Sequence, residues 1–132
     1  MKKLPLLFTL LILTVIFSSP SFSEWRKLTS NASADYYIDI ERIRKTDEYI
    51  YYWEMGDLLK PLDGSGTMSV KTYNQADCKV FRIMRLSMSF HKEPLGMGPG
   101  ETFIPEKEWL YPAPTSSMED FTEFVCNFAK YK

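Results

Sequence analysis

Residues 67–91, TMSVKTYNQADCKVFRIMRLSMSFH, decide the fold of this chain. The first half of the stretch alternates between two sets of side chains, which is typical of a half-buried β-strand. We expect the core side to carry Met68, Val70, Thr72, Ala76 and Cys78, and the other side Ser69, Lys71, Tyr73, Gln75 and Asp77. Residues 80–91 predict the next strand, with Met84, Leu86, Met88 and Phe90 on one side and Arg85, Ser87, Ser89 and His91 on the other.

Further strands are predicted on both sides of this stretch. Runs at 25–29, 35–39 and 48–55, rich in residues that favour a pleated surface, predict strands, and 108–111 predicts a last short one. Residues 40–45 predict either a helical turn or a plain connection. Residues 61–66 predict a turn, and the Gly- and Pro-rich segment 93–105 predicts a loop. Short hairpin connections make the sheet antiparallel.

The C-terminus predicts one strong helix. Ser116 and Glu119 have the spacing of a capping box. An apolar stripe at helical spacing follows, formed by Met118, Phe121, Phe124 or Val125, and Phe128. Such a stripe must be buried, and the sheet offers the surface for it. The predicted fold class is therefore α+β, a single twisted antiparallel sheet of about five to six strands with one C-terminal helix packed on one face.

The N-terminus reads as an export signal. Lys2 and Lys3 precede an apolar run at 4–17 and a small-residue segment ending at Ser23, which is the order of a cleavable signal peptide. The apolar run is shorter than the roughly 20 residues that span a bilayer, so we expect no stable membrane insertion after cleavage. We expect residues 1–23 to be the signal peptide and 24–132 the exported domain, in the periplasm or secreted, with surface association open.

The two cysteines fit this exported context. A small domain in an oxidising compartment commonly carries a disulfide. Cys126 lies beside the apolar stripe of the predicted helix, and Cys78 ends a predicted strand. A Cys78–Cys126 bridge would staple the helix to the sheet and stabilise the fold by about 4 kcal/mol.

Composition excludes several functions. A net charge of −1 gives no basic field for nucleic acid. The single histidine, His91, cannot by itself build a triad or a multi-histidine metal site, and we interpret it as a solvated residue at a strand end. We expect no enzyme activity, catalytic residue, metal or cofactor.

A binding surface is the best functional lead. Eight Tyr and three Trp exceed what so short a chain needs for a core. Tyr37, Tyr52 and Tyr73 have parities opposite to the more apolar sets, so they are predicted to form an exposed face, with Arg85 as a basic neighbour. Tyrosine gives a large contact area at a low entropy cost. Aromatic cladding of a solvated face is the plainer alternative.

The order of these features resembles the bacterial surface-adhesin protein E family, small exported domains of proteobacteria. The matching positions are Trp25, the run 36–39, Ile43, a Tyr-rich strand ending near Asp57, Ser69 with Lys71, the pair Asp77-Cys78, Trp109, 114–116 and 124–126. The resemblance implies a sheet with a helix held across it by the disulfide. It also implies an adhesive role, because members are similar to an adhesin that engages the host proteins vitronectin, laminin and plasminogen.

The predicted partner is therefore a host extracellular-matrix protein or an envelope protein. No cysteine follows the apolar run 4–17 to carry a lipid. The alternative is a periplasmic enzyme inhibitor, similar to lysozyme inhibitors, or an envelope-maintenance protein. An inhibitor would need a projecting loop, and 93–105 is the only predicted loop of sufficient length. Homodimerisation through an exposed edge strand is also open.

Overall fold

The protein is an antiparallel β-sheet with one helix against one of its faces. The computed structural model describes residues 24–130, so the predicted signal peptide, residues 1–23, lies outside the described residues. The strands are β1 (Trp25–Ser30), β2 (Ala34–Asp39), β3 (Arg44–Lys45), β4 (Ile50–Leu58), β5 (Ser69–Asp77), β6 (Arg82–His91) and β7 (Gly100–Phe103). Two 3-10 turns, η1 (Ile40–Arg42) and η2 (Pro94–Gly96), and the helix α2 (Ser117–Lys130) complete the fold.

The sheet has seven strands in the order β1-β2-β4-β5-β6-β7, with β3 paired to β4. Every strand pair is antiparallel, as predicted. The strands β3 and β7 were not expected, since their sequences were assigned to connections. The strand predicted at 108–111 is reduced to a single bridge between Leu110 and Ile83.

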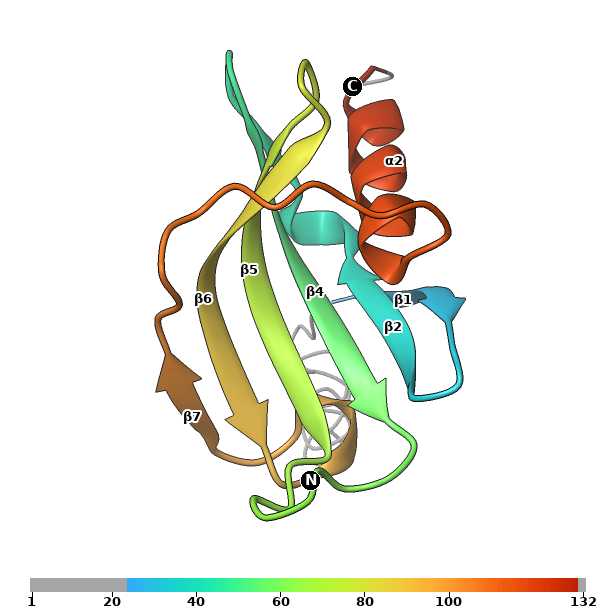
Figure 1. Ribbon diagram of the computed structural model, residues 1–132, viewed down its shortest axis with the longest axis vertical. Coiled ribbons are helices and arrows are strands. Elements are labelled where there is room, and N and C mark those ends of the chain that lie inside the picture. The colour runs from blue at the N-terminus through green and yellow to red at the C-terminus, as the bar shows by residue number, and fades with distance from the viewer. Residues whose placement is uncertain (1–23, 131–132) are drawn as a thin grey trace, which may run out of the picture.

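The helix lies across one face of the sheet, which we call the inner face (Figure 1). Ser116 caps it as predicted, because the Glu119 amide donates to Ser116 Oγ over 3.1 Å. Phe121 and Val125 are fully buried against Ile38, Tyr52 and other residues of the inner face. The predicted bridge between Cys78 and Cys126 is present, with the two Cα atoms 5.7 Å apart.

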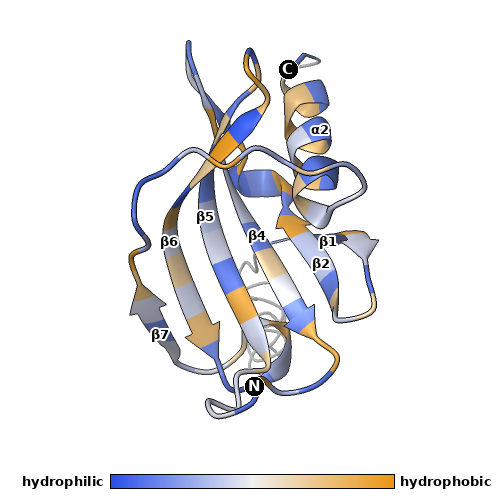
Figure 2. Ribbon diagram, viewed as in Figure 1, coloured by the Kyte–Doolittle hydropathy of each residue, from blue (hydrophilic) through white to orange (hydrophobic). Residues whose placement is uncertain are grey.

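The predicted side assignment is correct for β5 and wrong for β6. Hydrophilic and apolar residues are mixed along the central strands (Figure 2), but Thr72, Asn74 and Ala76 of β5 are all buried, on the inner face. In β6, however, Ser87 lies opposite Tyr73 while Arg85 lies opposite the next residue, Asn74, so Leu86 is an extra residue in a β-bulge. A bulge shifts the side-chain alternation by one. Met88 therefore shares the inner face with Arg85, and the predicted set of Met84, Leu86, Met88 and Phe90 is split between the two faces.

The segment predicted as one loop, 93–105, is instead folded against the sheet. It contains η2 and β7, and η2 packs on β4 and β5 at the outer face. The Leu95 amide donates to Asp57 Oδ1 and the Gly96 amide to Ser69 Oγ, each over 2.8 Å. Gly96 has φ +67°, and a Cβ there would strike the Lys71 side chain and come within 3.0 Å of Met55 Sδ. Only glycine allows this close approach without strain.

Candidate functional site: the outer aromatic surface

Three aromatic rings lie in a row on the outer face, opposite α2. The Tyr73 ring stacks with that of Tyr51 at 6.1 Å between centroids, and it contacts the Trp53 ring in a tilted arrangement at 4.9 Å. Trp53 and Tyr73 are direct cross-strand partners, and such aromatic pairs stabilise a sheet. Tyr37 lies on the same face, opposite Met55. We call Tyr37, Tyr51, Trp53 and Tyr73 the outer aromatic surface.

These four rings are half-buried, so part of each remains open to solvent. Polar side chains border them, because Gln75 lies opposite Tyr51 and Ser87 opposite Tyr73 in the strand register. Lys71 adds a cation beside Met55, near η2. A row of rigid rings with polar edges is the composition of the central part of many protein interfaces.

Two of the four residues predicted for the binding face belong to this surface. Tyr37 and Tyr73 do, but the prediction that Tyr52 is exposed is wrong. Tyr52 has 0% of its surface exposed and its ring stacks on Phe121 of α2, with 6.2 Å between centroids. Arg85 also lies on the inner face, opposite Asn74, so it does not border the outer tyrosines.

Tyr51 and Trp53 were missed because β4 carries aromatic residues on both sides. One side of the strand carries Ile50 and Tyr52, and the other carries Tyr51 and Trp53. Because both sides are large and mostly aromatic, the sequence alone does not fix which side faces the core. A usable signal was the preference of aromatic residues for direct cross-strand pairing. Tyr73 was correctly assigned to the outer side, and pairing it with Trp53 would have placed Tyr51 there as well.

His91 is a buried structural residue, and the interpretation of a solvated side chain is wrong. It is 5% exposed at the end of β6. Its Nδ1 lies 3.1 Å from the Gly98 carbonyl oxygen, and its Nε2 contacts Ser89 Oγ. Both ring nitrogens are thus used to fasten the chain between β6 and β7.

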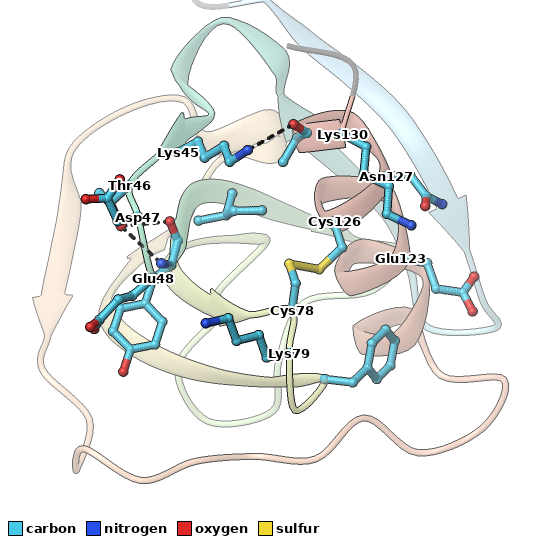
Figure 3. Close-up of a pocket in the computed structure, with 14 residues that line it drawn as sticks. Lys45, Thr46, Asp47, Glu48, Cys78, Lys79, Glu123, Cys126, Asn127 and Lys130 are labelled. Atoms are coloured by element: carbon cyan, nitrogen blue, oxygen red, sulfur yellow. Dashed lines mark hydrogen bonds between the residues drawn. A yellow bond between two sulfur atoms is a disulfide. The ribbon is translucent and has the colours of Figure 1, made fainter.

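A cleft of about 660 Å³ surrounds the disulfide (Figure 3). Its walls come from the β3–β4 turn, the β5–β6 turn and α2, and the Cys78–Cys126 bridge lies between them (Figure 3). Lys45 Nζ donates to the Ala129 carbonyl near the end of the helix over 3.4 Å, which favours the helix C-terminus. Charges of both signs line the walls, among them Lys79, Asp47, Glu48 and Glu123. This arrangement joins the helix to the sheet, and the cleft lining brings together no recognisable group of catalytic residues.

Across residues 24–130, no three His, Cys, Asp or Glu side chains are grouped so that they could hold a metal ion. No helix within the same residues has the length and apolar character needed to cross a bilayer.

The geometry thus defines a small domain whose disulfide-tethered helix covers one sheet face and whose other face displays aromatic rings. A family model described as surface-adhesin protein E matches residues 25–127, and the chain belongs to this family. No protein with a curated description matches the sequence.

Solved structures of Haemophilus influenzae protein E share the fold. Its crystal form II has a TM-score of 0.64 at 21% identity, covering 83% of this chain and 91% of that chain. A second structure of the same protein has a TM-score of 0.61 at 19% identity, covering 86% and 91%. Protein E from a non-typeable strain has a TM-score of 0.58 at 19% identity, covering 85% and 82%.

Proposed function

We propose that this protein is an exported, non-enzymatic adhesive domain that binds a protein partner through the outer aromatic surface. Membership in a family of surface adhesins supports the general role. The observation that carries the assignment to this surface is the row of partly exposed rings formed by Tyr51, Tyr73 and Trp53. Host extracellular-matrix proteins and envelope proteins are the partners to test first.

Rigid aromatic side chains are well suited to such contacts. Each ring buries a large area on binding while losing little conformational entropy. Stacking on Tyr73 already restricts Tyr51 and Trp53 in the unbound protein, which lowers the ordering cost further. Residues of this type usually dominate the binding free energy of an interface.

The test is direct binding of the chain without residues 1–23 to immobilised matrix proteins and to envelope extracts with identified components. Trp53→Thr and Tyr73→Thr keep the β-propensity of their strands and should each weaken binding about tenfold or more. Phe103→Thr is the matched control, since Phe103 is 53% exposed in the edge strand β7 and lies outside the outer aromatic surface. Absence of saturable binding would overturn the adhesive role. Full binding by both the Trp53 and the Tyr73 variant would overturn the choice of surface.

We also propose that residues 1–23 direct export and are removed after Ser23. Sequencing the N-terminus of the protein recovered from cell fractions tests both points, because the mature chain should begin at Glu24 and occur in the periplasm, in the medium or at the surface. A mature protein that begins at Met1 would contradict the cleavage.

Self-association is a separate question about partners. The four residues of the edge strand β7 are exposed, and an unpaired edge is a surface on which a second copy can add a strand. Sedimentation of residues 24–132 over a range of concentrations measures this. The inhibitor alternative receives less support, because the Leu95 and Gly96 amides hold the first part of the segment 93–105 against the sheet.

A further inference from the structure

The inner face of the sheet carries a groove beside the start of α2. Residues 104–116 cross in front of the sheet before they enter α2 (Figure 1). The groove has a volume of about 460 Å³. Its lining includes Tyr36, Glu54, Arg85 and Met88 from the sheet, and Leu110 and Met118 from the covering chain.

Arg85 is the notable group in this groove. It is half-buried, yet within residues 24–130 its guanidinium makes no hydrogen bond and no ion pair. Arg82, on the same strand, makes both a hydrogen bond and an ion pair. Its Nε donates to Asp77 Oδ2 over 3.0 Å, and its guanidinium lies 4.1 Å from the Trp109 ring centroid. Arg82 is thus fully engaged in the fold, whereas the donors of Arg85 are available to a ligand.

Asn74 and Glu54 lie beside Arg85 in the sheet. Asn74, its cross-strand partner, donates through Nδ2 to Glu54 Oε1 over 2.6 Å. The buried atoms Asn74 Oδ1 and Tyr52 Oη have no hydrogen-bond partner. Burial also raises the pKa of the Glu54 carboxyl. Neither Asn74 nor Tyr52 lines the groove, so a ligand in it would pair with the Arg85 guanidinium and not with these buried atoms.

The covering chain is attached to the sheet near Arg85. Leu110 is bonded to Ile83 in both directions, with the Ile83 amide donating over 2.9 Å and the Leu110 amide over 2.7 Å. Ile83 precedes Arg85 by two residues, so the covering chain is fastened to the sheet beside it. The apolar side chains of Met88, Leu110 and Met118 suit an apolar last residue.

We propose that this groove binds the C-terminus of a polypeptide that ends in an apolar residue, with its carboxylate held by Arg85. A chain terminus matches this lining because its carboxylate can accept from the Arg85 guanidinium while its last side chain packs against the apolar wall. Ser117 and Met118, in the first turn of α2, add the positive end of the helix dipole. The site lies on the opposite face from the outer aromatic surface and does not depend on it.

The test is an NMR titration of residues 24–132 with acetylated tetrapeptides of three alanines and a final phenylalanine. We expect the free acid to shift the amide signals of Thr72, Met88, Leu110 and Ser117 in a saturable way. The C-terminal amide should bind at least tenfold more weakly. An amidated peptide with an internal aspartate should do the same, which separates a chain terminus from an acidic side chain.

Charge variants provide the controls. Arg85→Gln should lose binding, whereas Arg26→Gln, the same charge change at an exposed position of β1, should bind like the parent. Ser117→Asp puts a negative charge at the groove without harming the helix start, so the melting temperature should hold while affinity falls at least tenfold. Glu54→Gln removes the competing carboxylate and should strengthen binding.

Three results would overturn the proposal. They are equal binding of acid and amide peptides, signal shifts confined to Tyr37 and Tyr73, and binding that Arg85→Gln leaves unchanged. Loss of matrix-protein binding in the outer-surface variants leaves this titration unaffected, so failure of either proposal is recognised separately.

Discussion

Removing the disulfide should destabilise the protein strongly, and the size of the effect can be worked out. Cys78 and Cys126 are separated by 48 residues in sequence, so the bridge closes a long loop in the unfolded chain. The loop-entropy relation gives about 4 kcal/mol for a loop of this length. Cys78 is exposed, so its replacement by alanine loses little packing. Most of the change should therefore come from the unfolded state.

The assay is thermal unfolding of residues 24–132 followed by circular dichroism. An unfolding entropy typical of a domain of this size converts 4 kcal/mol into a fall of about 15–20 °C in melting temperature. Cys78→Ala combined with Cys126→Ala should show this fall, and the reduced parent protein should melt at the same temperature as the double variant. Asn127→Ala, a neighbouring change in the same cleft, is the control and should leave the melt nearly unchanged.

The reasoning would be refuted by a double variant that melts within about 4 °C of the parent, which corresponds to roughly 1 kcal/mol. In that case the packing of Phe121 and Val125 would hold α2 on the sheet in the unfolded ensemble as well, and the bridge would remove little entropy from it.

Three further variants test single contacts by the same melting assay. Tyr52→Phe removes a buried hydroxyl that has no partner and keeps the stack on Phe121, so stability should hold or rise by about 1 kcal/mol; a clear loss would show an unseen partner. Gly96→Ala should cost about 1–3 kcal/mol, because its φ is +67° and the new Cβ meets Lys71; a neutral result would show that η2 is free to shift. Burial raises the pKa of Glu54 above its ordinary 4.5, so the folded state holds this proton more tightly and loses stability as the pH rises from about 4.5. Glu54→Gln should therefore be more stable than the parent at pH 7 and equal to it below pH 4, and parallel pH profiles would contradict this.

Part of the fold could be predicted because local patterns agreed with the tertiary structure. The alternation in β5 placed Ala76 inside and Tyr73 outside, and the capping residue Ser116 marked the start of α2. The two cysteines, in a chain predicted to be exported, predicted the disulfide between helix and sheet. In each case one local signal sufficed, and packing reinforced it.

The other features depend on contacts between residues far apart in sequence. The bulge at Leu86 carries no glycine or proline to announce it, yet it reverses the side of every residue beyond it in β6. Likewise, His91 is buried only because the chain from 92 to 99 folds back over it, with Gly98 as one of its partners. Burial set by a returning segment leaves no periodic signal at the residue that becomes buried.

The position of α2 decides which aromatic residues the protein displays. In β4, Tyr51 and Trp53 alternate with Ile50 and Tyr52, so either side of the strand is aromatic enough to be a core or a contact surface. The helix packs Phe121 on Tyr52 and thereby assigns the other side to solvent. Because the bridge to Cys126 tethers α2 to the end of β5, the disulfide supports the distinction between the two faces as well as stability. If the reduced protein still folds, the solvent exposure of Tyr52 should then be measured. An exposed Tyr52 would mean that the two faces are no longer distinct.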